Sequence, residues 1–207
     1  MDTVHILYFF TASVAITLMP GPDILFVIAQ SMSRGKTAGI ATALGLCTGL
    51  IVHTLAAALG VAAILHQSAI AFAVLKYAGA LYLLYLAWQA AREGKATFDL
   101  PQAEQRPHWA LYRKGIFMNL LNPKVSLFFL AFLPQFVPPS AENAVWPMIL
   151  LGFLFLLQAL VVFTAVSIFA GMIGQRWLRR PAVARHVNKV KAALFAILGI
   201  RLALMER

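Results

Sequence analysis

The amino-acid sequence predicts an all-α integral membrane protein with six transmembrane helices, arranged as two inverted three-helix repeats in which the first and fourth helices are broken. Three observations lead to this fold class: an apolar composition, six long apolar stretches, and basic residues that gather on one side of the membrane. Of the 207 residues, 61% are hydrophobic and 12% are charged. A typical soluble domain is about 45–50% apolar and about 25% charged, so this chain has too few charges to cover a surface that faces water.

Four of the six stretches are continuous. A helix that crosses a bilayer needs about 20 mostly apolar residues. Residues 37–65 and 144–175 meet this need most clearly, because they contain no Asp, Glu, Lys or Arg. Residues 68–91 contain Lys76 as their one charged residue, and residues 190–205 form a short stretch with a basic residue near each end. We expect all four to span, although hydropathy alone could miss the last.

The other two stretches contain prolines that cannot continue a regular helix. Residues 4–33 are interrupted by Pro20-Gly21-Pro22-Asp23, and residues 115–136 by Asn122-Pro123-Lys124. Proline lacks a backbone N–H and crowds the preceding turn, so each stretch should form a broken helix. A break at membrane depth leaves amide and carbonyl groups that only protein, water or ligand can satisfy, which predicts a polar cavity at the breaks.

The basic residues give the orientation. The net charge is +10, which in a soluble chain would suggest a nucleic-acid partner. Six alternating spans instead place thirteen of the 17 Lys and Arg residues on one side: Arg34, Lys36, Arg92, Lys95, Arg106, Arg113, Lys114, Arg176, Arg179, Arg180, Arg185, Lys189 and Lys191. This side should be cytoplasmic, both termini should be periplasmic, and no nucleic-acid partner is expected.

The organisation that follows is one transmembrane domain, residues 1–207. The first repeat covers about 1–91, a cytoplasmic loop about 92–112, and the second repeat about 113–207. Proline-interrupted segments at corresponding points of two inverted halves indicate the binding site of a transporter, although chance similarity of apolar segments is the alternative. The G-x-x-x-G of Gly45 and Gly49 permits close helix approach within the chain or between two copies, so a homodimer stays open.

Two charged residues directly follow the equivalent prolines. A charge at membrane depth costs at least about 2.5–3.5 kcal/mol unless it is paired or solvated. Asp23 is therefore a candidate for coupling transport to protons or for binding a substrate ammonium, and a permanent ion pair with Lys124 is the structural alternative. Lys124 could hold Asp23, bind a substrate carboxylate, or neutralise freed carbonyls. Lys76 could belong to the site or extend to the membrane surface.

The remaining polar residues of the spans have simpler interpretations. Asn119 and Asn122 could bind substrate or cap a half-helix. His53 has no second His or carboxylate at ligand spacing, so we expect no metal site. Cys47 is the single cysteine, which excludes an internal disulfide. Gln158 is expected to make a hydrogen bond between packed helices.

Several motifs, in order along nearly the whole chain, resemble the LysE/RhtB family. They are Met19-Pro20-Gly21-Pro22-Asp23, the glycines from Gly39 to Gly49, the segment from Lys76 to Leu83, Asn122-Pro123-Lys124, Phe128-Phe129 and Pro134-Gln135-Phe136. The resemblance implies a bacterial inner-membrane exporter of amino acids that uses the proton-motive force and needs no cofactor.

The function expected from these observations is secondary active export of an amino acid, by alternating access around a site near the membrane midplane. A membrane-embedded enzyme acting on a lipid-linked substrate is the main competing function, but the chain lacks the paired carboxylates or His/Asp cluster that such chemistry needs. The chain could also export a different metabolite or serve as an accessory subunit.

Overall fold

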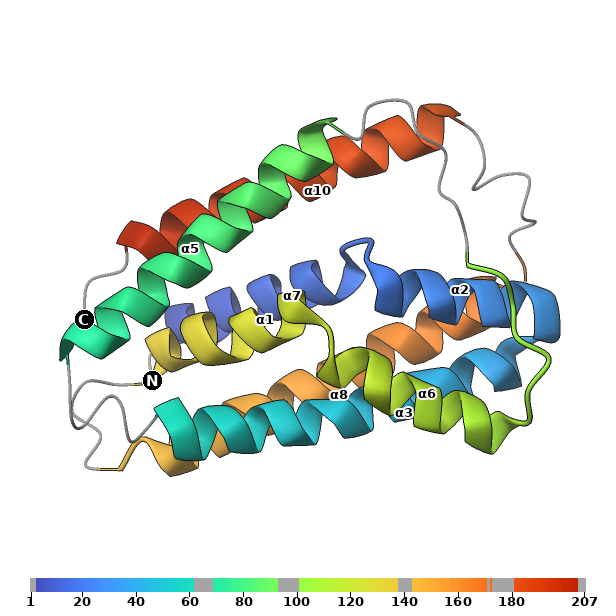
Figure 1. Ribbon diagram of the computed structural model, residues 1–207, viewed down its shortest axis with the longest axis horizontal. Helices are drawn as coiled ribbons and strands as arrows, with labels where there is room; N and C mark the ends of the chain where they lie inside the picture. Colours follow the sequence, from blue (N-terminus) through green and yellow to red (C-terminus); the bar gives the residue numbers. More distant parts are fainter. Residues whose placement is uncertain are drawn as a thin grey trace.

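A computed structural model describes residues 3–61, 69–92, 101–137, 143–170, 172 and 181–204, and these residues form helices and turns without a strand. The elements are α1 (Thr3–Leu18), α2 (Pro22–Arg34), α3 (Lys36–Ala56), the π-helical turn η1 (Ala57–Val61), α5 (Ala69–Arg92), α6 (His108–Leu120), α7 (Pro123–Leu127), the π-helical η2 (Phe128–Phe132), the 3-10 turn η3 (Leu133–Phe136), α8 (Val145–Ala170) and α10 (Pro181–Leu204). The long helices run lengthwise along the molecule (Figure 1).

Both predicted helix breaks are confirmed. The helices Ile6–Leu18 and Pro22–Arg34 are bent by 58° relative to each other, and the helices His108–Leu120 and Pro123–Phe136 by 51°. Within the described residues, three helices, Lys36–Gly60, Ile70–Arg92 and Val145–Ala170, are long and apolar enough to cross a membrane. Counting each bent pair as one span raises the number to five.

Two helix boundaries differ from the sequence prediction. α10 begins at Pro181, whose fixed φ suits the first helical position, and not near residue 190. Only its second half, Ala192–Leu204, is apolar, so the sixth span stays a prediction. α6 begins at His108, inside the segment predicted as cytoplasmic loop, because its first turns are polar and hydropathy locates apolar stretches rather than helix ends.

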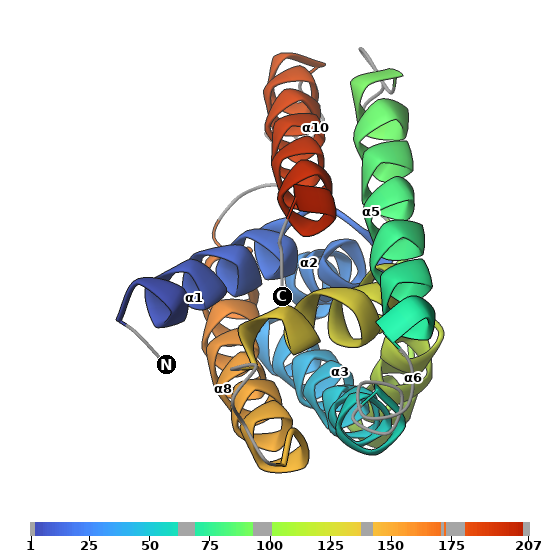
Figure 2. The same ribbon diagram turned by 90° about the vertical axis from the view of Figure 1, so that its left-hand side faces the viewer.

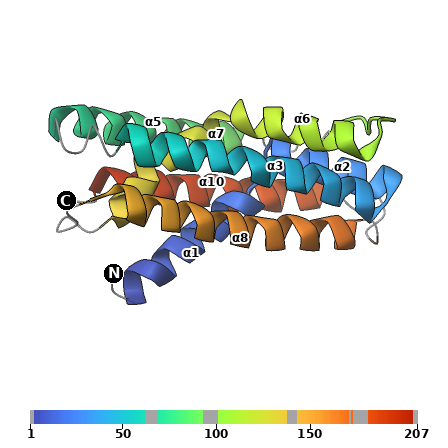
Figure 3. The ribbon, with the colours of Figure 1, turned by 90° about the horizontal axis from the view of Figure 1, so that it is seen from below.

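The helices form two parts. α5 packs along α10, and Figure 2 shows the upper parts of this pair projecting away from the other helices, while α5 also contacts η2. In the larger part, α3 packs against α2, α6 and α8, and α1 packs against α8. Figure 3 shows α3, α6 and α8 extending side by side along the molecule. Both helix breaks belong to the larger part and lie on its side toward α5 and α10.

Apolar side chains occur both inside and outside this bundle. Phe128 is buried and packs against Phe132 and Phe155, with ring centroids 5.0 and 5.1 Å apart. On the outside, Ile70 and Trp146 are 79% and 71% exposed. Large apolar side chains on the outer surface are costly in water and stable against lipid, as the composition predicted.

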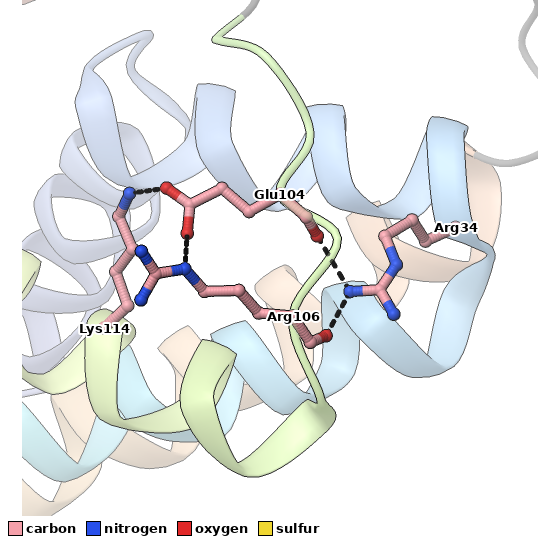
Figure 4. A network of polar contacts seen from close by, with 4 residues as sticks. All are labelled: Arg34, Glu104, Arg106 and Lys114. Carbon is pink, nitrogen blue, oxygen red and sulfur yellow. Dashed lines mark hydrogen bonds and ion pairs between the residues drawn. The ribbon is translucent and has the colours of Figure 1, made fainter.

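A network of charged side chains lies at one end of the molecule. α1 begins and α10 ends at one end, while the α2–α3 turn and the start of α6 lie at the other (Figure 1). At that second end the Arg34 guanidinium donates to the Glu104 carbonyl at 2.8 Å and also to the Arg106 carbonyl (Figure 4). The Glu104 carboxylate binds Lys114 and lies 2.9 Å from Arg106 Nε. The segment before α6 is therefore tied to both α2 and α6.

Candidate functional site

A side chain from the second helix break, Lys124, hydrogen-bonds to backbone carbonyls at the first helix break. The Ile16 carbonyl would accept from residue 20 in a regular helix, but Pro20 has no N–H. Lys124 Nζ donates instead to the Ile16 carbonyl at 3.0 Å and to the Met19 carbonyl at 3.2 Å. Three roles were open to Lys124: holding Asp23, binding a substrate carboxylate, or neutralising freed carbonyls. The third is the one that these hydrogen bonds perform. The two breaks therefore lie against each other.

At the second helix break, too, a proline leaves a carbonyl without its helical donor and a side chain donates to that carbonyl instead. The Asn119 carbonyl would accept from residue 123, which is Pro123. His53 Nε2, from α3, lies 3.0 Å from this carbonyl, and since a carbonyl only accepts, the imidazole is the donor. The Asn122 N–H also reaches it at 3.0 Å. His53 was not predicted as a site residue; its signal was a buried imidazole in a span without charges.

Asp23 lies in the first turn of α2 and is 3% exposed. Its Oδ2 accepts a hydrogen bond from Asn119 Nδ2 at 3.2 Å. The helix N-terminus adds a favourable field for the carboxylate. Its Oδ1 has no hydrogen-bond partner among the described residues. Asp23 and Lys124 thus hydrogen-bond to separate groups, in place of the direct pair that the sequence left open.

The two asparagines have different environments. Asn122 caps α7, since its Oδ1 accepts the backbone N–H of Lys124 at 3.1 Å. Its Nδ2 is buried and has no hydrogen-bond partner in the described part of the chain. Asn119 binds Asp23 and does not cap a helix. Gly49, on α3, leaves room for it, because a Cβ at this glycine would lie 2.7 Å from Asn119 Oδ1.

A small cavity lies at the buried side of the breaks. Its polar lining comes from Asp23, Asn119, Lys124 and Thr17, and phenylalanines form much of the rest. The volume is about 20 Å³, room for about one water molecule. Gln158, on α8, donates to Thr17 Oγ1 at 2.9 Å, so the predicted interhelical hydrogen bond of Gln158 is present and orients this wall.

A larger cleft lies on the other side of the same breaks. Its volume is about 360 Å³, within the range of about 300–1,000 Å³ that small-molecule sites occupy. The breaks contribute Pro20, Gly21, Pro22, Asn122, Pro123 and Lys124. α5 contributes Tyr82, which lies in the motif from Lys76 to Leu83, together with Leu86 and Gln89, which the sequence analysis did not name. Their spacing of four and three residues, on one helix face, was the available signal.

The structure brings together most of the predicted site residues but not all. Asp23 and Asn119 line the small cavity, Asn122 and the prolines of the breaks line the cleft, and Lys124 lines both. Lys76 lines neither, and its Nζ lies 4.6 Å from the centre of the Tyr77 ring. In the described ranges, no group of three or more His, Cys, Asp or Glu side chains could hold a metal ion.

Comparison with known proteins decides the family. The model of the LysE type translocator matches residues 14–206. The chain belongs to the LysE type translocator family. It is therefore a multi-pass membrane protein of a family of transporters, and both breaks and both cavities lie inside the family region.

Relatives of this LysE-family chain cover almost its whole length. An uncharacterized membrane protein of Pseudomonas aeruginosa is 38% identical over 98% of each chain. An uncharacterized membrane protein of Vibrio cholerae is 31% identical over 97% of this chain and 96% of its own. A homoserine/homoserine lactone efflux protein of Salmonella typhimurium is 31% identical over 92% of each chain. No solved structure matches this chain.

Proposed function

We propose that this LysE-family protein is a secondary active exporter of amino acids in the bacterial inner membrane, driven by the proton-motive force. The observation that carries the proposal is the meeting of two helix breaks at a cleft of about 360 Å³. Broken helices that meet at a polar cavity are the arrangement that transporters use for substrate binding. Salmonella relatives named for efflux of homoserine and its lactone support a small amino-acid cargo, which a cleft of this volume can hold.

Alternating access in our proposal uses two inverted halves. The bends of 58° and 51° are similar, as equivalent breaks should be. α3 packs on α8 and α5 packs on α10, so the second helix of one half meets the second of the other, and the third meets the third. This pairing is what an in-plane two-fold axis predicts for six spans with both termini in the periplasm.

We assign the coupling of amino-acid export to proton movement to Asp23. Two residues that line the small cavity each have a buried oxygen without a hydrogen-bond donor among the described residues, Asp23 Oδ1 and Asn119 Oδ1. A proton on the carboxylate supplies a donor, and so does the ammonium group of an amino acid. Binding of one would then exclude the other, which is the competition that a proton antiporter requires.

Lys124 is assigned to the link between the cavities. Lys124 lines both the small cavity and the cleft, and its ammonium donates to the neutral carbonyls of Ile16 and Met19. Hydrogen bonds between ions are stronger than those to neutral carbonyls, so a substrate carboxylate in the cleft competes for this ammonium. Substrate binding thereby loosens the contact between the two breaks, which is a route to the change of access.

The test is amino-acid efflux from bacteria that overproduce the protein and are loaded with a mixture of dipeptides. We expect one or a few amino acids to accumulate outside the cells, and Asp23→Asn to lose this at equal membrane abundance. Asp23→Glu, which keeps a titratable carboxyl, is the matched control and should retain part of the efflux. Efflux equal to that of empty-vector cells for every amino acid would contradict the proposal and favour a different metabolite as cargo.

A further inference from the structure

One face of α5 differs from the rest of that helix. Tyr82, Leu86 and Gln89 follow one another at spacings of four and three residues and all line the cleft. At a rise of 1.5 Å per residue they form a stripe about 10 Å long, comparable to an extended amino acid. Leu81 and Trp88, on another face of α5, are 67% and 53% exposed, as lipid-facing side chains would be. α5 therefore has a cleft face and an outer face.

The opposite wall offers groups suited to a carboxylate. Asn122 is 3% exposed, lines the cleft, and has an Nδ2 without a hydrogen-bond partner among the described residues. The N-terminal end of α2, at Gly21 and Pro22, borders the same space and carries partial positive charge. Lys124 supplies a full positive charge. A carboxylate is common to all amino acids, so this wall does not distinguish one amino acid from another.

The stripe side of the cleft is uncharged. Tyr82 and Gln89 present a hydroxyl and an amide, and Leu86 lies between them with Phe195 of α10 beside the stripe. Among the described residues, no Asp or Glu lines the cleft. The charged side chain of Lys or Arg would lose water there without meeting a carboxylate, which is strongly unfavourable.

We propose that Tyr82, Leu86 and Gln89 form the specificity wall of the cleft and select amino acids with a short, uncharged side chain. This inference rests on the proposed function and adds the substrate class to it. Leu86 receives the carbon atoms of the side chain, while Tyr82 and Gln89 bind a hydroxyl or carbonyl at its end. A site built to hydrogen-bond such a group disfavours analogues that lack it.

The experiment measures efflux of two amino acids from the same cells, so that their ratio is independent of protein abundance. Gln89→Glu places a carboxylate in the stripe at nearly constant volume, and we expect the ratio of lysine to threonine efflux to rise about tenfold or more. Tyr82→Phe should lower the ratio of threonine to valine efflux about threefold to tenfold. Tyr77→Phe, the same change at a tyrosine of α5 that is 51% exposed and does not line the cleft, is the matched control and should leave both ratios unchanged.

The outcomes separate the two proposals. Amino-acid efflux with unchanged ratios in both Gln89→Glu and Tyr82→Phe overturns the specificity wall and leaves the exporter function standing. If Gln89→Glu does not reach the membrane, Tyr82→Phe decides, since it removes only one oxygen atom. Absence of amino-acid efflux from the unsubstituted protein overturns the proposed function and the specificity wall together.

Discussion

Asn119 donates a hydrogen bond to Asp23 at 3.2 Å across 96 residues of sequence. The bond joins the last turn of α6 to the first turn of α2 and so connects one helix break to the other. The two breaks are stabilised in the same way. At each, a carbonyl that would accept from the missing N–H of a proline accepts instead from a basic side chain distant in sequence. Lys124 serves the Ile16 carbonyl and His53 serves the Asn119 carbonyl.

Replacing Asp23 should separate coupling from binding. In membrane vesicles, Asp23→Asn should lose substrate accumulation driven by an imposed pH gradient, because the amide cannot carry the proton. Exchange of labelled for unlabelled substrate needs no net proton movement and should persist, but with a raised KM, because the neutral amide binds the substrate ammonium more weakly than the carboxylate does. Gradient-driven accumulation at the unsubstituted rate would show that Asp23 has a structural role only.

Replacing Lys124 should destabilise the contact between the breaks. Lys124→Met keeps much of the side-chain volume but leaves the Ile16 and Met19 carbonyls without their donor. A buried polar group that loses its partner costs about 1–3 kcal/mol, so the melting temperature in detergent should fall by several degrees. Lys124→Arg retains a cationic donor and should recover part of the stability; equal melting temperatures for all three proteins would contradict this role.

Replacing His53 tests the corresponding contact at the second break. His53→Phe removes the imidazole donor to the Asn119 carbonyl but retains the aromatic ring that neighbours Phe129. We expect a loss of about 0.5–1.5 kcal/mol in the free energy of unfolding, since the Asn122 N–H still reaches that carbonyl. The measurement is thermal unfolding in detergent. His53→Gln, which keeps an N–H donor, should lie between the two proteins in stability.

The glycines of α3 should prove essential for packing inside the chain. A Cβ on Gly45 would collide with the Tyr112 carbonyl of α6. Gly45→Ala should therefore force α3 and α6 apart and destabilise the protein by about 1–3 kcal/mol, as overpacking does. Gly60→Ala is the matched control, since a Cβ there meets no atom within 4 Å. Similar thermal unfolding of the two variants would refute the close α3–α6 contact.

The polar network at the α2–α6 end should protect the segment before α6. Glu104→Gln removes the charge that binds Lys114 and Arg106, while Gln102→Ala changes an exposed neighbour outside the network. Hydrogen–deuterium exchange of the backbone amides in residues 102–106 should be several times faster in Glu104→Gln than in the unsubstituted protein. Gln102→Ala should exchange at the original rate, and equal rates for both variants would exclude this role of Glu104.

Much of the fold was predictable because the relevant properties are local. The absence of charges over residues 37–65 and 144–175 predicted two long apolar helices, and α3 (Lys36–Ala56) and α8 (Val145–Ala170) lie in these ranges. Prolines 20, 22 and 123 predicted both breaks, because a residue without an N–H interrupts a helix wherever that helix packs. Helix ends were less predictable, as the start of α6 at His108 illustrates, since polar turns extend apolar helices without a hydropathy signal.

Some features of the candidate site were likewise predictable from the sequence, whereas others depended on the tertiary structure. The sequence by itself determined the membrane class, the breaks, and the presence of Asp23, Asn119, Asn122 and Lys124 beside them. Only the tertiary structure decided that Asn119 binds Asp23, that Lys124 binds the Ile16 and Met19 carbonyls, and that a stripe of α5 faces the breaks. Helix formation and breakage depend on neighbouring residues, whereas these partners come from helices distant in sequence and depend on how the helices pack.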